Sequence, residues 1–381
     1  MDSFIPRQIT TALIDRLKPG KVLVLLGPRR VGKTVLIENL LEKHIIEPFI
    51  KLNGEDMATQ AVLGERTLAN YNRLVGDRRL LIIDEAQKVP EIGLALKLMI
   101  DNIQGLKIIA TGSSVFDLTN KLGEPLTGRK TTFYLFPLAQ MEYAPFENLA
   151  ETRARLPERM IFGNYPELLQ YSSEKQKADY LNELVNGALL KDIFSFEGIR
   201  NASRITDLLR LIAFQMGKEV SLEELGRNLQ LSRNTVEKYL DLLAKTFVLF
   251  KIPGFSRNLR SEVTKTSRWY FHDNGIRNAI IANFNPLMLR DDTGALWENY
   301  FVNERIKFQH YSGRMTKNYF WRTYQQQEID WIEEEGGQLS AFEIKWNPAK
   351  KARVPSAWQQ AYPGSQFHVI KPDNYLDWIL I

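Results

Sequence analysis

Short apolar runs mark the first third of the 381-residue chain. They lie at Lys21–Leu26, Leu80–Ile83, Leu106–Ala110 and Thr132–Phe136. Leucine, isoleucine and valine dominate the first three, and the fourth is mainly aromatic. Runs of this length with little polar alternation are typical of strands buried on both faces of a parallel sheet. The pattern predicts an α/β domain with a parallel sheet over residues 1–147.

The middle of the chain, residues 148–286, has mainly helical spacing. Within it, Ser221-Leu-Glu-Glu224 is a capping box, in which the serine caps helix amides and the last glutamate reaches back. It predicts a helix over residues 221–229, and Ser232 is expected to cap a second helix before the apolar run Phe247–Ile252. Two helices across a tight turn, followed by strands, indicate a winged helix-turn-helix.

The last segment, residues 287–381, combines both patterns. A helix is predicted over Leu296–Gln309, and strands are predicted at Phe320–Arg322, Glu328–Ile332 and Ala341–Trp346. In the predicted strand Ala341–Trp346, residues two apart lie on the same face of the sheet. Because the three segments 1–147, 148–286 and 287–381 differ in pattern, we expect three α/β or helical modules in sequence.

Composition excludes several function classes. Hydrophobic residues make up 44% and charged residues 25% of the chain, as in globular proteins. No apolar run approaches the roughly 18 residues that cross a bilayer, so we expect no membrane contact and a cytoplasmic location. The absence of cysteine excludes disulfides, cysteine nucleophiles and thiolate zinc sites. The net charge of +5 permits contact with nucleic acid without requiring it.

A phosphate-binding loop follows the first apolar run. The segment is Gly27-Pro28-Arg29-Arg30-Val31-Gly32-Lys33-Thr34, which fits the pattern GxxxxGK[ST] in full. The two glycines allow the tight path along which amides face the phosphates of ATP. Lys33 is expected to reach the β- and γ-phosphates, and Thr34 to bind Mg²⁺ through its hydroxyl. An amphipathic helix pattern follows the loop, as this function requires.

The second apolar strand ends in Asp84-Glu85, the arrangement known as Walker B. Asp84 is predicted to hold Mg²⁺, directly or through water. Glu85 is predicted to polarise the water that attacks the γ-phosphate. An apolar run followed by two acids is a weak signal alone, but about fifty residues after a complete phosphate loop it is a strong one.

Two further positions are candidates for the same reaction. A strand between the two Walker strands is expected to end at a γ-phosphate sensor, and Thr111 and Ser113 are both candidates. Arg129, after a flexible Thr-Gly, is a candidate arginine finger or an ordinary surface arginine. The sequence leaves open whether such a finger would act on its own subunit or on a neighbour.

Taken together, several motifs resemble a bacterial and archaeal family of AAA+-type ATPases that end in a domain of unknown function. They are Gly27–Thr34, Leu81–Pro90, Ala110–Ser114, Leu126–Arg129, Phe162–Glu167, Leu190–Ile193, Tyr270–Gly275 and Trp297–Val302. The resemblance covers nearly the whole chain. It implies ATP binding and hydrolysis with Mg²⁺, a helical lid over the nucleotide within residues 148–215, and homo-oligomers. It does not imply a chemical role for Asp273.

The second predicted helix of the winged module carries the candidate DNA contacts. In a major groove, Arg233, Asn234 and Lys238 would meet DNA. Glu237 and Asp241 lie on the same helix and would repel phosphate. Winged helices also serve as packing modules beside ATPase domains, and both interpretations stay open.

The C-terminal segment carries a second acidic constellation. Glu298 lies on a predicted helix, Asp330 on a strand, and Glu343-Ile-Lys345 on the next strand. This order resembles the PD-(D/E)XK nuclease superfamily. The resemblance implies that Asp330 and Glu343 bind a divalent cation, that Glu298 completes the site, and that Lys345 activates water.

Two functions therefore remain. The first is a Mg²⁺-dependent ATPase that processes DNA through its winged helix and nuclease-like domain. The second is a slowly hydrolysing, ATP-controlled switch whose C-terminal domain binds a partner without cutting. The substrate, the pathway and the number of subunits are not indicated by the sequence.

Overall fold

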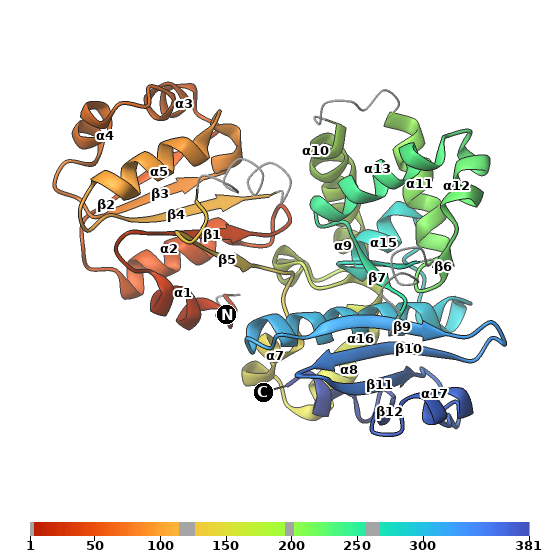
Figure 1. Cartoon of the computed structure of the whole chain (residues 1–381). Coiled ribbons are helices and arrows are strands. Elements are labelled where there is room, and N and C mark those ends of the chain that lie inside the picture. Colours follow the sequence, from red (N-terminus) through yellow and green to blue (C-terminus); the bar gives the residue numbers. More distant parts are fainter. Residues whose placement is uncertain (1–3, 114–125, 195–201, 257–266, 381) are drawn as a thin grey trace. The chain divides into compact units, whose positions relative to one another are not determined.

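The chain folds into two compact units (Figure 1). The computed structural model describes residues 4–113, 126–194, 202–256 and 267–380. The first unit comprises Phe4–Phe136 with Lys245–Phe247, and the second comprises Pro137–Ala244 with Val248–Ile381. The two later modules that the sequence separates at residue 287 thus belong to one unit. No helix among these described residues is long and apolar enough to cross a membrane.

A five-stranded parallel sheet forms the centre of the first unit. Its strands are β1 (Lys21–Leu26), β2 (Phe49–Asn53), β3 (Leu80–Asp84), β4 (Lys107–Gly112) and β5 (Lys130–Tyr134). They lie in the order β2-β3-β4-β1-β5, and all neighbouring pairs are parallel. The prediction of a parallel sheet with a strand between the two Walker strands is confirmed. The edge strand β2 was not predicted, because its residues are only half-buried or exposed.

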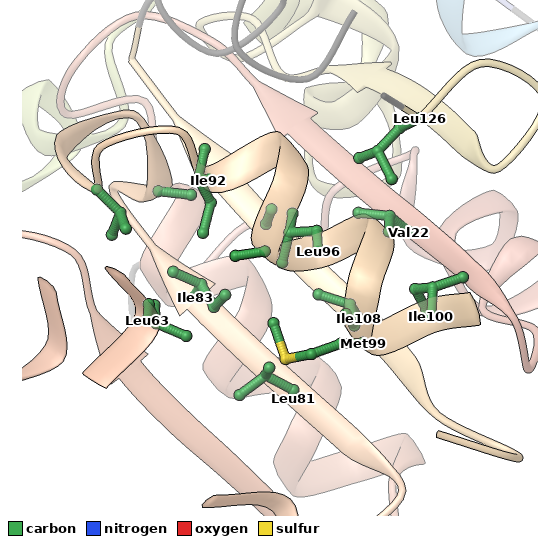
Figure 2. Close-up of a cluster of buried hydrophobic side chains, with 14 of the residues drawn as sticks. Val22, Leu63, Leu81, Ile83, Ile92, Leu96, Met99, Ile100, Ile108 and Leu126 are labelled. Atoms are coloured by element: carbon green, nitrogen blue, oxygen red, sulfur yellow. The ribbon is translucent and has the colours of Figure 1, made fainter. Parts of the chain in front are cut away.

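Helices cover both faces of this sheet. They are α1 (Thr10–Arg16), α2 (Lys33–His44), α3 (Met57–Gly64), α4 (Leu68–Val75) and α5 (Ile92–Asn102), with a 3-10 turn η1 (Ala86–Lys88). Side chains of α5 pack over β1, β3 and β4, where Leu96 and Met99 meet Ile83 and Ile108 (Figure 2). The alternate strand residues, such as Leu23 and Leu25, are also buried. Burial on both faces explains the nearly continuous apolar runs.

The second unit begins with helices. They are α7 (Gln140–Tyr143), η2 (Ala144–Phe146), α8 (Leu149–Phe162), η3 (Pro166–Gln170), α9 (Glu174–Glu183), η4 (Leu184–Leu189), α10 (Leu190–Phe194), α11 (Ala202–Phe214), α12 (Leu222–Leu229), α13 (Arg233–Lys245) and α15 (Asn274–Ile280). Ser221 accepts from the Glu224 amide at 3.3 Å, and Ser232 accepts from the Thr235 amide at 3.2 Å. Both helices therefore begin where the sequence predicts.

A small antiparallel sheet accompanies α11, α12 and α13. Its strands are β6 (Glu219–Val220), β7 (Leu249–Pro253) and β8 (Ser267–Phe271), in the order β6-β8-β7. The central strand β8 is buried along its whole length. Ser267 and Arg268 of β8 are therefore held on both sides by backbone pairing.

The C-terminal part of this unit is a four-stranded mixed sheet. Its elements are η5 (Leu287–Leu289), α16 (Thr293–Tyr311), β9 (Lys317–Arg322), β10 (Glu328–Glu335), β11 (Gln338–Ile344), α17 (Ser356–Ala361), β12 (Gln366–Ile370) and η6 (Tyr375–Trp378). The strand order is β12-β11-β10-β9, with only β11 and β12 parallel. The register of β10 against β9 slips between Ile329 and Ile332. This bulge falls at Asp330, and bulges re-aim side chains next to functional sites.

Asp273 links the start of α15 to the turn at Asn164. Asp273 Oδ1 accepts from the Gly275 and Ile276 amides at 2.8 and 3.2 Å, which caps α15. Its Oδ2 accepts from the Asn164 amide at 2.8 Å. A Cβ on Gly163, where φ is +76°, would lie 1.9 Å from Asp273 Oδ1. Two of the motifs quoted above therefore form one buried contact.

Candidate functional site

The phosphate loop lies between β1 and the start of α2. Gly27 allows close backbone approach, since a Cβ there would lie 2.2 Å from the Leu135 carbonyl oxygen. Gly32 precedes α2 with a φ of +91°, a left-handed value that favours glycine. Lys33 is buried, and its Nζ donates to the carbonyl oxygens of Gly27 and Pro28 at 2.9 and 3.1 Å. The lysine head is thus held within the loop that the sequence predicts.

The two predicted magnesium ligands meet. Thr34 Oγ1 donates to Asp84 Oδ2 at 2.9 Å, although fifty positions separate the two residues along the chain. Thr111, at the end of β4, donates to the other oxygen of Asp84 and accepts from the Glu85 amide at 3.2 Å. Parallel strands bring their carboxyl ends to one edge of the sheet, and this edge carries the loop as well.

The predicted catalytic glutamate is held by two side chains. Gln87 Nε2 donates to Glu85 Oε2 at 2.5 Å, and Ser113 Oγ donates to the same oxygen at 3.2 Å. Gln87 also lies 3.1 Å from Ser113 Oγ and is buried. Both sensor candidates therefore contact the Walker B acids, Thr111 at Asp84 and Ser113 at Glu85. The role of Gln87 was missed, although the residue lies inside the quoted motif.

A buried arginine near the N-terminus supports the loop. Arg7 Nη1 donates to the Val31 carbonyl oxygen at 2.7 Å, and Nη2 donates to that of Phe136 at 2.5 Å. The partners lie 24 and 129 positions away along the chain. No local sequence signal could have identified this contact.

The remaining loop residues divide by exposure. Pro28 and Val31 are buried, and Arg30 is exposed with a φ of +61°. Arg29 is half-buried, with Nη2 3.8 Å from Glu55 Oε1.

Arg129 lies at the amino ends of the strands, whereas the phosphate loop lies at their carboxyl ends. The register pairs Val22 with Lys130, so Arg129 precedes the amino end of β5. Its Nε donates to Asp101 Oδ1 at 2.6 Å. Five strand residues separate this level from the loop, which corresponds to about 17 Å.

The acidic residues of the C-terminal part come together around Lys345. Its Nζ lies 2.5 Å from Glu343 Oε1 and 3.4 Å from Asp330 Oδ2. The Ile344 amide donates to Asp330 Oδ2 at 2.9 Å. Burial and the neighbouring Asp330 raise the pKa of Glu343. The pKa of Lys345 is also raised, because the two carboxylates outweigh its own burial.

The fourth predicted residue of this constellation joins from α16. Tyr270 donates to Glu298 Oε1 at 2.6 Å. Burial, followed by the nearby charge of Asp330, raises the pKa of Glu298 to about 8. No three histidine or acidic side chains among the described residues lie close enough together to hold a metal ion. The predicted residues thus share one region without forming a closed ligand set.

A cation that the sequence did not indicate lies among these acids. Arg268, on β8, has Nη1 3.8 Å from Glu298 Oε1 and 3.6 Å from Asp330 Oδ1. Its Nη2 donates to Glu328 Oε2 at 3.0 Å, and the guanidinium lies 4.8 Å from the centre of the Phe320 ring. Its side chain is only 4% exposed. The sole hint was its position two residues before the Tyr270 motif.

The candidate DNA contacts lie on one exposed face of α13. Arg233, Asn234 and Lys238 are all exposed. Arg233 Nε lies 3.1 Å from Glu223 Oε1 on α12, so part of its charge is offset. The acidic neighbours Glu237 and Asp241 are exposed as well.

The sheet order, the loop and the Thr34–Asp84 contact define a P-loop nucleoside triphosphatase fold of the AAA+ type. In agreement, residues 19–144 match the sequence model of a family described as an AAA domain. Residues 153–287 and 293–375 match two domains of unknown function, DUF8612 and DUF4143. Residues 19–144 of the first unit are therefore similar to AAA domains in sequence, in agreement with the P-loop fold of this unit.

Relatives span nearly the whole chain. An uncharacterized protein of Methanocaldococcus jannaschii is 25% identical over 91% of this chain and 80% of its own length. An uncharacterized protein of Mycobacterium tuberculosis is 27% identical over 90% of this chain and 74% of its own length.

Similar solved structures include replication initiation proteins. The AMPPCP-bound DnaA of Aquifex aeolicus is 16% identical, with a TM-score of 0.28 over 62% of this chain and 86% of that chain. Domain III of the Thermotoga maritima DnaA is also 16% identical, with a TM-score of 0.31 over 60% of this chain and 94% of that chain.

Proposed function

We propose that the protein hydrolyses ATP with Mg²⁺ in its N-terminal unit. The observation that carries this proposal is the hydrogen bond between Thr34 and Asp84, which joins the two halves of the metal site. The oxygen ligands are those that Mg²⁺ prefers, and the ion would neutralise charge on the phosphates. Lys33 would bind the β- and γ-phosphates, while Glu85 would accept a proton from the attacking water.

Steady-state phosphate release tests this proposal. Lys33→Ala should abolish ATP binding, and Glu85→Gln should retain binding while turnover falls at least about 100-fold. Lys97→Ala, at an exposed position of α5, is the matched control and should leave both unchanged. Turnover that survives Glu85→Gln would refute the assigned base.

An oligomer would give Arg129 a function. Arg129 lies at the amino ends of the strands, away from the phosphate loop, and this position argues against contact with the ATP of its own subunit. If Arg129 acts as a finger, it acts on the ATP of a neighbour, after release from Asp101. Turnover per subunit should then rise with protein concentration. Mixing Arg129→Ala subunits with Lys33→Ala subunits should restore activity, because each supplies what the other lacks.

DNA contact through α13 is the proposed coupling. The order α11-β6-α12-α13-β7-β8, with β8 between β6 and β7, supports a winged helix. Replacing Arg233, Asn234 and Lys238 together by alanine should weaken DNA binding and flatten its salt dependence. An unchanged salt slope would favour the packing role instead.

The C-terminal part is the second candidate function, a phosphodiesterase site of the PD-(D/E)XK type. The order α16-β9-β10-β11-α17-β12 and the Asp330, Glu343 and Lys345 cluster support it. The guanidinium of Arg268 lies among the carboxylates in the place of a cation, and carboxylate oxygens are suitable ligands for divalent metals. No three acidic side chains of the described residues lie close enough together to hold a metal as they stand, so Glu298, Asp330 and Glu343 would hold one only after Arg268 moves away. That metal would supply Lewis-acid activation of water. Lys345 would orient the water and stabilise charge on the phosphate.

Cleavage of DNA with Mn²⁺ separates this candidate from the partner-binding switch. Cleavage lost in both Asp330→Ala and Lys345→Ala would support the nuclease. Slow ATP turnover, unaffected by DNA and without cleavage, would support the switch.

A further inference from the structure

We propose that Arg268 is the resident cation of the C-terminal acidic cluster, and that a divalent cation binds Asp330 and Glu298 only by displacing its guanidinium. This inference rests on the metal-binding role proposed above for these residues. Arg268 lies on β8, outside the residues 298–343 that supply the acids, and would control metal binding by them.

The charges of the cluster favour exchange between Arg268 and a metal. Arg268 is approached by three carboxylates, those of Glu298, Asp330 and Glu328, and Lys345 is paired with Glu343. Two cations therefore stand in for the charge that a divalent ion would bring. Ionised buried carboxylates are costly without such compensation, and either Arg268 or a metal can supply it.

The distances from Arg268 to two of the carboxylates also favour exchange. The separations of 3.6 and 3.8 Å from Arg268 to Asp330 and Glu298 are too long for hydrogen bonds. In addition, Nε of Arg268 is buried without a hydrogen-bond partner. A divalent ion binds carboxylate oxygens at about 2.0–2.6 Å and would satisfy them better. Arg268 is thus a loose counter-ion that a metal can replace.

The backbone of Arg268 is fixed in its sheet. Arg268 lies on the central strand β8, paired with Glu219 on β6 and Ile252 on β7. Its backbone cannot retreat without breaking that sheet, so the side chain alone must move. Glu328, which is about half exposed, already accepts from Arg268 at 3.0 Å and would keep the guanidinium bound as it moves toward the surface.

The expected effect follows from repulsion between the two cations. A single and a double positive charge about 4 Å apart oppose metal binding even at the dielectric constant of water. Removing the guanidinium should therefore tighten metal binding at least about 30-fold.

Isothermal titration of the full chain with Mn²⁺, in buffer freed of metal, tests the proposal. Arg268→Gln should bind at least about 30-fold more tightly than wild type, and adding Asp330→Asn should abolish the gain. Arg314→Gln removes an arginine that pairs with Glu335 in the same unit and should not change the affinity. Thermal melts supply a second readout, because Mn²⁺ should stabilise Arg268→Gln more than wild type.

The outcomes are distinct. Equal or weaker Mn²⁺ binding by folded Arg268→Gln, with binding still dependent on Asp330, would overturn the displacement model but keep the metal site. Absence of Asp330-dependent binding in both folded proteins would overturn the metal site and this inference with it. If Arg268→Gln does not fold, the double variant Arg268→Gln/Glu328→Gln removes one positive and one negative charge and so restores the charge balance. This double variant should also bind Mn²⁺ more tightly than wild type.

Discussion

Gln87 is predicted to position the catalytic glutamate. Its amide donates to Glu85 Oε2 and lies against Ser113, and its side chain is 4% exposed. A hydrogen bond to a charged group contributes about 1.5–3 kcal/mol. If that energy holds the carboxylate where the attacking water must lie, Gln87→Leu should lower kcat about 10- to 100-fold, since each 1.36 kcal/mol is tenfold.

The assay is steady-state ATP hydrolysis beside equilibrium binding of a fluorescent ATP analogue. Gln87 contacts Glu85 and Ser113, not the phosphate loop, so the Kd should change less than about threefold while kcat falls. Gln104→Leu makes the same replacement at an exposed position of the same unit and should leave both unchanged. An unchanged kcat, or a loss of binding that matches the loss of kcat, would refute the positioning role.

Three further substitutions test the structure elsewhere. Arg7→Gln should weaken ATP binding about 10-fold by loosening the loop that it supports, which the same fluorescent titration measures. Asp292→Asn should lower the free energy of unfolding by about 3 kcal/mol in urea, because it leaves two buried arginines without their counter-ion, whereas exposed Asp291→Asn should not. Burial raises the pKa of Asp292, but the two arginines lower it by more, so the net shift is downward. The stabilisation that Asp292 gives the fold is therefore present above pH 3.8 and is lost as pH falls below that value. Gly163→Ala should cost about 3 kcal/mol, since its Cβ would overlap Asp273, and equal stability of the two proteins would contradict the contact.

The features that the sequence predicted are local. The phosphate loop and the Walker B acids each lie within a short segment, and the capping box spans four residues, so spacing alone identifies them. The position of β4 between the Walker strands followed from the same motifs. By contrast, the contacts of Arg7 join residues 24 and 129 positions away, and no periodicity reports a pairing of that kind.

The division into units also depends on packing between distant segments. The sequence separates a helical middle from a C-terminal module, because the hydrophobic pattern changes near residue 287. The structure joins them through side chains that bridge the boundary. Asn299 on α16 accepts from the Phe271 amide at 2.9 Å, and Asn274 donates to the Leu296 carbonyl oxygen at 3.0 Å. A change of pattern marks a change of architecture and does not by itself mark a boundary between units.

Asp273 and Asp330 are both buried acids, but the groups that contact their carboxylate oxygens differ. Burial raises the pKa of Asp273 to about 6, and three backbone amides oppose that rise. Those amides are fixed parts of α15 and of the Asn164 turn, so both of its oxygens are committed to the fold. Asp330 is also buried, and its Oδ2 accepts from the Ile344 amide and faces Lys345. Its Oδ1, however, faces the side chain of Arg268, at 3.6 Å, and that side chain can move. Only an acid with an oxygen whose partner can exchange is available to a metal or a phosphate, and this distinction favours Asp330 rather than Asp273 as the metal ligand proposed above.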